Sequence, residues 1–459
     1  MGNIVSLTNI SGVLISVSRY LLIFLMVLYT VQCFTVFRYH SQNRQKVVFL
    51  RQNISMFIIH FTAFLVLFLE QMNLQIVVFY GVQVVFLLLS LLLWYTFYPR
   101  ASRLLINNMM MLITIGLIML TRLSFDSAVK QFVILCVGMA VGLVIPVIVR
   151  RVMMLTRMTI AYTFVGIGLL GLVFVAARVT NGAKLSLSVG GFSFQPSEFV
   201  KIIFVFAVAG LLTRARDLRH VIIATVLAAI HVMILVVSRD LGSALIFFIT
   251  YLAMLFAATR NPFLVLSGVF AGSLASVAAY FLFSHVRVRV QIWKDPFADY
   301  SGSGYQISQS LFSIAAGGWL GTGLGKGSPG AIPFVQQDMM FSAITEELGG
   351  IFSICLILVC LNCFIMFINV AMQLTSRFYR LVALGLGTTY AVQVFLTIGG
   401  GIKLIPLTGV TLPLVSYGGS SALTTIAMFA IVQGLYMLRI DEEKEMEEDG
   451  HAQGVPIGG

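Results

Sequence analysis

The chain has 459 residues, of which 59% are hydrophobic and only 10% are charged, whereas a soluble domain carries about 25% charged residues. This composition excludes a soluble globular protein and predicts an all-α membrane protein, because spanning segments must pair their own backbone amides. The formal net charge is +12, but Lys and Arg gather at the ends of apolar runs rather than on one surface. That distribution argues against a nucleic-acid partner and is typical of a protein whose partners include membrane lipid.

Apolar runs that could cross a bilayer follow one another along the whole chain. A span takes ~20 apolar residues, and about thirteen runs approach that length. They fall near residues 12–37, 53–69, 74–97, 105–121, 131–149, 158–177, 199–213, 221–238, 241–258, 262–284, 340–373, 381–398 and 418–438. The first run is too long for the core of a signal peptide and no small-residue cleavage site follows it, so we expect it to be kept as a helix.

Cationic connections alternate with connections that carry few Lys or Arg. The connections at 38–51, 100–103 and 150–157 are rich in these residues, and the positive-inside rule places them in the cytoplasm. With an odd number of spans, the N-terminus lies outside the cell and the C-terminus lies in the cytoplasm. An acidic stretch near the end, followed by Gly and Pro, predicts that residues 439–459 form a disordered cytoplasmic tail.

Residues 285–339 form a long outward connection that is rich in Gly, Ser and aromatic residues. It is far longer than the ~2 to 8 residues that usually join bundled helices, and long ordered loops often carry function. Val290 and Trp293 fall on one side at helical spacing, with Arg287 and Lys294 on the other. This pattern predicts an amphipathic helix on the membrane surface, although the VRVRVQI run also fits the alternation of a strand.

Ionisable residues stand at the start of two predicted spans. A proline opens one helix with Glu198 in its first turn, where a carboxylate complements the helix dipole, and Lys201 follows one turn later. Arg239 and Asp240 form a charge pair in a tight turn between two apolar runs. Each pair fits a helix cap as well as a functional site. Charges at a membrane boundary are costly, which favours a polar pair with a role.

The outward connection also collects carboxylates and cations. Asp295 directly precedes a proline, which holds its backbone extended. Asp338 and Glu346 are spaced to lie close to the same face of one helix. The accompanying cations are Arg287, Arg289, Lys294 and Lys326. Carboxylates can act as bases or ion ligands and cations can bind phosphates. The set therefore suits a substrate that carries both hydroxyls and phosphates.

Several short patterns point away from familiar sites. The GTGLGKG run at 321–327 lacks the Ser or Thr and the preceding strand of a nucleotide-binding loop. The cysteines lie in apolar runs without a second ligand pair, and the sequence has neither an HExxH helix nor a GxSxG turn. Near the end, Pro406 and Pro413 interrupt a membrane segment before Ser416. Such a break is tolerated only where it packs against protein or lines a cavity.

Taken together, these motifs resemble those of the SEDS family, the FtsW, RodA and SpoVE type proteins. The runs QPSEFVK, DLGSA, WKDPF with GYQISQS, GGWLGTGLGKG, the Asp before EELGG, and TGVTLPLVSYGGSS occur in the family's order within residues 105–438. The resemblance implies a ten-helix bundle in a bacterial plasma membrane, with a large extracytoplasmic loop between its seventh and eighth helices. Residues 1–104 then form about three additional N-terminal transmembrane helices.

The resemblance also implies an activity. Family members polymerise lipid II, an undecaprenyl diphosphate-linked disaccharide peptide, into glycan strands during division, elongation or sporulation, with a class B penicillin-binding protein as the transpeptidase. Asp295 resembles the family's essential outer-loop aspartate, which implies that it is the general base for the attacking sugar hydroxyl. Further positions that match family acids or the last-helix signature are Glu198, Asp240, Asp338, Glu346 and Ser416.

The departing diphosphate needs positive charge in either of two forms. Arg239, Lys294 and Lys326 are the candidate side chains, while Lys201 stands beside Glu198 as a further polar contact. A divalent cation, Mg²⁺ or Mn²⁺, held by outer carboxylates would do the same task. The alternative function is a flippase for lipid-linked peptidoglycan precursors, against which charges on one side of the membrane argue. A third is a scaffold that only recruits a transpeptidase.

Overall fold

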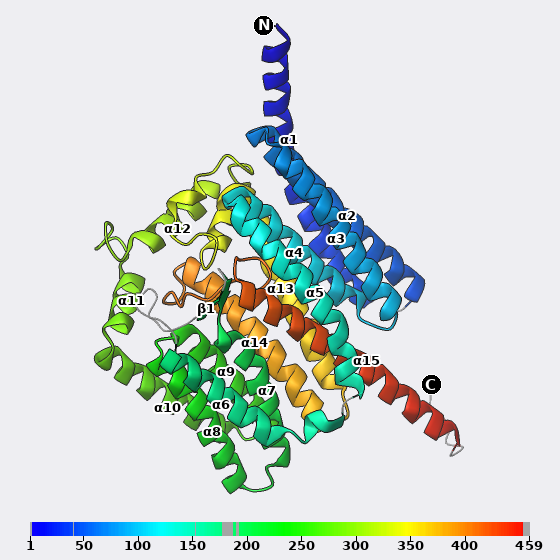
Figure 1. The fold of residues 1–459 in the computed structure, drawn as a ribbon, viewed down its shortest axis with the longest axis vertical. Coiled ribbons are helices and arrows are strands. Elements are labelled where there is room, and N and C mark those ends of the chain that lie inside the picture. Colours follow the sequence, from blue (N-terminus) through cyan, green and yellow to red (C-terminus); the bar gives the residue numbers. More distant parts are fainter. Residues whose placement is uncertain (1, 40, 152, 177–186, 190–191, 453–459) are drawn as a thin grey trace.

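The protein, represented by a computed structural model that describes residues 2–39, 41–151, 153–176, 187–189 and 192–452, is built almost entirely of helices (Figure 1). A short antiparallel hairpin pairs Leu187 with Phe194. In chain order the elements are α1 (Gly2–Thr35), η1 (Val36–Arg38), α2 (Gln42–Gln71), α3 (Leu74–Phe97), α4 (Arg103–Leu123), α5 (Phe125–Arg151), η2 (Met153–Thr156), α6 (Thr159–Ala176), β1 (Leu187–Val189), β2 (Phe192–Phe194), α7 (Pro196–Arg214), α8 (Leu218–Val237), α9 (Leu241–Thr259), α10 (Pro262–Leu282), α11 (Ser284–Lys294), α12 (Tyr305–Gly317), η3 (Pro329–Ala331), α13 (Met340–Gln373), α14 (Arg377–Gly401) and α15 (Gly419–Ala452). The predicted all-α class is confirmed.

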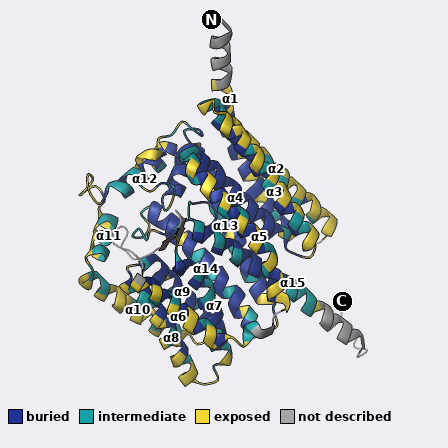
Figure 2. Cartoon of the chain, in the orientation of Figure 1, coloured by how far each residue is buried: buried dark blue, intermediate teal, exposed yellow. Residues whose placement is uncertain are grey.

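Within the described residues, 12 helices are long and apolar enough to cross a membrane, and the shorter apolar helix α6 occupies the remaining predicted span. Helices α1 to α3 precede the ten others, which are α4 to α10 and α13 to α15. The long connection, with α11 and α12, therefore lies between the seventh and eighth helices of the ten, as expected. Figure 2 shows buried residues concentrated in the centre of this bundle, while α10 has none. The protein is a multi-pass membrane protein.

One end of the bundle gathers the cationic connections around the C-terminal helix. Asp441 of α15 forms ion pairs with Arg100 at 3.1 Å and with Arg150 at 2.5 Å. The neighbouring Glu442 accepts a hydrogen bond from the backbone N–H of Thr375 at 3.1 Å. Arg377 donates to the carbonyl of Ala258 at 2.8 Å. The connections at 100–103 and 150–157, which the sequence predicts on one side of the membrane, thus share one end of the structure.

The C-terminal segment differs from the prediction. A disordered tail was predicted from residue 439, but α15 continues as a helix to Ala452. The stretch is rich in Glu, Lys and Met, which favour helix, and Arg439 pairs with Glu443 one turn later at 3.3 Å. The part of the predicted tail at 453–459 lies outside the described residues.

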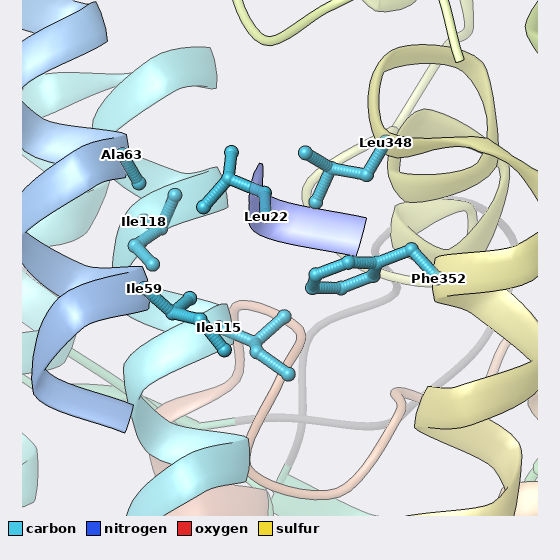
Figure 3. Close-up of a pocket in the computed structure, with 7 residues that line it drawn as sticks. All are labelled: Leu22, Ile59, Ala63, Ile115, Ile118, Leu348 and Phe352. Carbon is cyan, nitrogen blue, oxygen red and sulfur yellow. The ribbon is translucent and has the colours of Figure 1, made fainter. Parts of the chain in front are cut away.

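The N-terminal helices pack directly on the bundle. Figure 3 shows one part of this junction, where apolar side chains from α1, α2, α4 and α13 meet. They leave a gap of about 10 Å³, which is about the space of a single water molecule. The junction is therefore close-packed and offers no room for a ligand.

A ring of buried amides also ties α1 to α4 and α13. The hydroxyl of Tyr29 donates to Oδ1 of Asn108 at 3.0 Å, and Nδ2 of Asn108 donates to Oδ1 of Asn362 at 2.7 Å. Nδ2 of Asn362 donates in turn to the carbonyl of Cys33 at 3.1 Å. All four residues are fully buried. Polar groups satisfied in this way hold membrane helices together, so α1 is an integral part of the bundle.

We expect Asn108→Leu to lower the stability of the protein by about 1–2 kcal/mol, because it leaves the amide of Asn362 and the hydroxyl of Tyr29 without their partner in a dry environment. The measurement is thermal unfolding in detergent, followed by circular dichroism. Asn43→Leu is the matched control, since Asn43 is exposed at the start of α2. Equal midpoints for the two variants would contradict a stabilising role for the ring.

Candidate active site

A cavity of about 770 Å³ lies where the long connection meets the bundle, which is within the usual ~300–1,000 Å³ of ligand sites. Its wall is formed by α11 with α12, by the turn before α9, by the segment before α13, and by the segment from the end of α14 to the start of α15, with further residues from α5 and from the end of β2. Its ionisable or strongly polar lining residues are Gln195, Arg239, Asp240, Arg289, Gln306, Gln337, Asp338 and Lys403. The cavity thus brings together carboxylates and cations from distant parts of the sequence.

Asp240 caps the N-terminus of α9. Its Oδ1 accepts a hydrogen bond from the backbone N–H of Ser243 at 3.1 Å, and its Oδ2 accepts one from the hydroxyl of Ser197 at 3.0 Å. Burial raises the pKa of this carboxyl, and the hydrogen bonds from Ser243 and Ser197 partly oppose the shift. Both oxygens are already engaged by protein donors, so we interpret Asp240 as a group that shapes the cavity wall.

Asp338 stands just before α13, and its Oδ1 accepts a hydrogen bond from Nε2 of Gln306 at 3.2 Å. Burial raises its pKa to about 6, against the opposing effects of hydrogen bonds from its own backbone and Gln306 and of the charge on Arg289. Such a carboxyl is mostly ionised at neutral pH and still binds a proton better than an exposed aspartate does. Asp338 therefore has the properties of a general base.

Arg289 extends from α11 into the cavity. Its Nη1 donates to the carbonyls of Leu407 at 3.0 Å and Thr408 at 3.1 Å, which fixes the guanidinium. Burial lowers the pKa of Arg289, while the charges of Asp240 and Asp338 act in the opposite direction. The guanidinium thus lies close enough to both carboxylates to feel their charge.

The helix predicted at the start of the long connection is present as α11. Its location on the membrane surface stays a prediction, and one of its faces lines the cavity. Trp293, which follows Arg289 by one turn, also lines the cavity. Its indole Nε1 donates to the carbonyl of Lys403 at 3.2 Å. One face of α11 therefore closes the cavity.

Two further cations line the cavity, Arg239 and Lys403. Both have left-handed backbone conformations, with φ of 64° and 61°, which cost free energy in residues other than glycine and often mark functional sites. The pKa of nearby His285 is lowered, first by burial and then by the charges of Arg239 and Arg289. The surroundings are thus positive, as binding of a phosphate group requires.

Glu198 and Lys201 lie beneath the cavity rather than in its wall. Their side chains form a buried ion pair at 2.8 Å, and Nζ of Lys201 donates to Oε1 of Gln393 at 2.7 Å. Nε2 of Gln393 donates in turn to the carbonyl of Thr411 at 3.0 Å, and Thr411 lines the cavity. The predicted pair is therefore connected to the site through one glutamine.

Three further predicted site residues, in addition to Glu198 and Lys201, also lie outside the cavity wall. Asp295 is exposed, and its Oδ1 accepts hydrogen bonds from the backbone N–H groups of Phe297 at 3.0 Å and Ala298 at 3.3 Å. Lys294 is exposed at the end of α11. The buried hydroxyl of Ser416 accepts from the backbone N–H of Leu412 at 3.1 Å and closes a turn. None of the three is among the residues that line the cavity.

Asp338 and Glu346 were expected on one helical face, but the structure separates them. Helix α13 begins at Met340, so Asp338 precedes it. Oε1 of Glu346 accepts from the backbone N–H of Ser328 at 2.6 Å. Nζ of Lys326 forms an ion pair with Oε1 of Glu70 at 2.8 Å. Glu346 and Lys326 therefore belong to a second polar cluster, which is distinct from the cavity.

Sequence reasoning singled out Arg239, Asp240 and Asp338 among the cavity residues. It counted Arg289 among the cations beside the outward acids, and it gave no site role to Gln306 or Lys403. The four-residue spacing of Arg289 and Trp293 on a predicted helix was the signal that could have found the inward face of α11. Binding of a divalent metal ion stays a prediction. In the part of the chain that the structure describes, no three His, Cys, Asp or Glu side chains gather where they could hold a metal ion.

Comparison with known proteins places this fold. Residues 102–440 match the FtsW/RodA/SpoVE family, described as cell cycle proteins. The peptidoglycan glycosyltransferase RodA of Mycobacterium leprae is 36% identical over 366 residues, covering 73% of this chain and 78% of that protein. The probable peptidoglycan glycosyltransferase FtsW of Tolumonas auensis is 31% identical over 327 residues, covering 69% of this chain and 83% of the relative.

Solved structures share the fold. One, described as "Structural coordination of polymerization and crosslinking by a peptidoglycan synthase complex", superimposes with a TM-score of 0.64 at 25% identity, over 74% of this chain and 98% of that one. The rod shape determining protein RodA of Thermus thermophilus superimposes with a TM-score of 0.57 at 23% identity, over 74% of this chain and 97% of its own. On the match to residues 102–440 and the identity to its curated members, the chain belongs to the FtsW/RodA/SpoVE family.

Proposed function

We propose that this protein is a peptidoglycan glycosyltransferase that polymerises lipid II into glycan strands. The observation that carries the proposal is the cavity, in which Asp338 lies with Arg239, Arg289 and Lys403. A half-buried carboxylate with a raised pKa suits removal of a proton from a sugar hydroxyl. The cations suit a departing diphosphate. The named activities of the RodA and FtsW relatives support the same reaction.

In the proposed reaction, the 4-hydroxyl oxygen of an acceptor GlcNAc attacks C1 of a donor MurNAc. The bond from C1 to the diphosphate oxygen breaks, and its electron pair leaves with undecaprenyl diphosphate. The carboxylate of Asp338 takes the hydroxyl proton, which contributes ~100- to 10,000-fold. The side chains of Arg239, Arg289 and Lys403 stabilise the negative charge that develops on the diphosphate, and the enclosed wall orients the two sugars.

The proposed location is the outer face of a bacterial plasma membrane. The end of the bundle where Asp441 binds Arg100 and Arg150 carries the cationic connections, which the positive-inside rule assigns to the cytoplasm. The start of α13, where Asp338 lies, is the opposite end of the helix that reaches those connections. This orientation puts the N-terminus outside and the C-terminus in the cytoplasm.

The proposed partner is a class B penicillin-binding protein, whose transpeptidase would cross-link the strands in division, elongation or sporulation. A related fold in a peptidoglycan synthase complex supports such a partnership. A divalent cation, Mg²⁺ or Mn²⁺, is a further proposal. Because Asp338 serves as the base, Asp240 is the cavity carboxylate that would hold the ion beside the diphosphate if it exchanged a present partner, and the ion would supply additional positive charge there.

The test is glycan polymerisation from purified lipid II in detergent by the full chain, with a candidate partner transpeptidase and with Mg²⁺, Mn²⁺ or a chelator. Long glycan strands from the wild-type protein would support the proposal. If strands are absent with every partner and ion while lipid II crosses vesicles that contain the protein, the flippase is the function. If neither process occurs but the protein still recruits the transpeptidase, the scaffold is the function.

Asp295→Asn is expected to keep the polymerisation rate within about twofold of wild type, because Asp295 is exposed and does not line the cavity, and such surface substitutions usually change stability by no more than ~0.5 kcal/mol. Asn can still accept the two backbone hydrogen bonds that Asp295 accepts now. The same lipid II assay measures this. Loss of polymer in this variant, with activity retained in Asp338→Asn, would return the role of base to Asp295, as the family resemblance implies.

A further inference from the structure

Helices α1 to α3 lie outside the family match, which begins at residue 102. The related chain from the peptidoglycan synthase complex is covered over 98% of its own length by 74% of this chain. The family fold is thus complete without these three helices, which we call the N-terminal module. In this protein, however, the module reaches the outer end of the bundle and contacts the long connection there.

Two contacts join the module to residues 321–338, which we call the outer segment. Nη1 of Arg19 in α1 donates to the carbonyl of Gly321 at 2.9 Å. Oε1 of Glu70 at the end of α2 pairs with Nζ of Lys326 at 2.8 Å. Gly325 lies directly against Glu70: a Cβ added there would approach Cγ of Glu70 to 3.1 Å, and its φ of 88° favours glycine. The segment is thus fitted closely to the module.

The bundle holds the same segment from its other side. Arg122 at the end of α4 donates to the carbonyls of Gly325 at 3.3 Å and Gly327 at 3.2 Å, and its Nε donates to Glu347 at 3.0 Å. The backbone N–H of Ser328 donates to Glu346 at 2.6 Å. The first part of the outer segment is therefore clamped between the N-terminal module and the start of α13.

The last part of the outer segment enters the cavity wall. Phe334, Gln337 and Asp338 line the cavity. Nε2 of Gln306 donates both to the carbonyl of Pro333 at 3.2 Å and to Asp338 at 3.2 Å. Only a short length of chain separates the clamped residues from Asp338, so a shift of the clamp moves the backbone that carries this carboxylate. Small displacements of a reacting group can cost ~100-fold in rate.

The N-terminal module can hold the outer segment in place because the module is itself fixed to the bundle. The amide ring and the apolar junction attach α1 and α2 to α4 and α13. We propose that the N-terminal module positions the outer segment, and through it Asp338, with Arg19 and Glu70 as its positioning residues. The expected effect on kcat rests on the proposed function, because it assumes that the protein polymerises lipid II. The positioning itself can be measured without activity.

The test compares Arg19→Gln, Glu70→Gln and the double variant, all in the full-length protein. Hydrogen exchange of residues 321–338 reads positioning, and lipid II polymerisation reads turnover. The ion pair of Glu70 with the half-exposed Lys326 contributes little alone, so we expect kcat of Glu70→Gln to be ~2-fold lower. In the double variant the charged hydrogen bond from Arg19 to Gly321 is also lost, and we expect kcat to be ~5- to 10-fold lower. KM for lipid II should stay within about twofold, because neither residue contacts the cavity. Exchange of the outer segment should accelerate in the same order.

Two matched control variants and a double-mutant cycle on Glu70 and Lys326 separate the loss of positioning from a general loss of charge. Asp126→Asn and Lys130→Gln remove exposed charges near the start of α5 and should change neither readout. Glu70→Gln combined with Lys326→Gln should be no worse than the stronger single variant, since the two act through one pair. Unchanged exchange in the Arg19 and Glu70 double variant would overturn the proposal, and so would faster exchange with unchanged kcat. If the wild-type protein makes no glycan, the proposed function fails, and exchange alone decides whether the module positions the segment.

Discussion

Asp338→Asn is expected to lower the rate of glycan polymerisation by ~100- to 10,000-fold, the contribution of a general base. The carboxylate lies in the cavity wall and binds Gln306, and an amide of the same shape can keep that contact but cannot take a proton. The measurement is kcat and KM for lipid II in detergent. The loss should fall on kcat, because the side chain acts in the transition state.

The pH dependence of the wild-type protein provides a second check on Asp338. Its pKa of about 6 means that the carboxyl is protonated below this value and ionised above it. A base works only when ionised, so kcat/KM should fall about tenfold per pH unit below pH 6 and level off above pH 7. Asp126→Asn is the control, since that exposed aspartate lies outside the cavity. We call the fall of kcat/KM at low pH the acid limb of the profile. If the Asp338→Asn variant retained wild-type activity and the same acid limb, Asp338 would be excluded as the base.

Arg289→Gln is expected to lower kcat by ~100-fold or more, the usual cost of removing one donor that stabilises developing charge. It should also move the acid limb. The positive charge of Arg289 favours the ionised form of Asp338 and so lowers its pKa. Removing that charge raises the pKa, and the limb should shift to higher pH.

The measurement is the pH profile of kcat/KM between pH 5 and 8, with Arg287→Gln as the control. Arg287 lies two positions away on α11, is exposed and donates to the carbonyl of Phe281 outside the cavity. An Arg289→Gln profile with lowered kcat but an unshifted limb would show that Arg289 acts on the substrate and not on Asp338. Full activity in Arg289→Gln would remove it from the site.

Most of the fold could be predicted because lipid imposes one rule on every span: the segment must be helical, apolar and about 20 residues long. The number and order of the helices follow from that rule, and so does the place of the long connection. The tail from residue 439 escaped it. The composition of this segment suggested disorder. In the structure α15 continues through Asp441, and the carboxylate of Asp441 forms ion pairs with two arginines.

The site was harder to predict because it is assembled from distant parts of the chain. Asp240 and Asp338 were recognised as acids next to spans, yet nothing in their spacing shows that Arg289 lies close to both. Asp295 drew attention because the following proline presents its carboxylate outward. In the structure that carboxylate caps its own turn. Local sequence describes how a side chain leaves the backbone, whereas a cavity depends on how helices pack.

The amide ring at Asn108 has a consequence for biogenesis. Asn108 and Asn362 are 254 residues apart, and the ribosome delivers the chain from its N-terminus. While the later helices are still being made, the amide of Asn108 has no partner from α13, and an unpaired polar group in lipid carries a penalty. Insertion of α13 removes this penalty. The ring therefore forms only after the chain has been inserted as far as α13, and a chain that ended before α13 would leave the amide of Asn108 without this partner in the lipid.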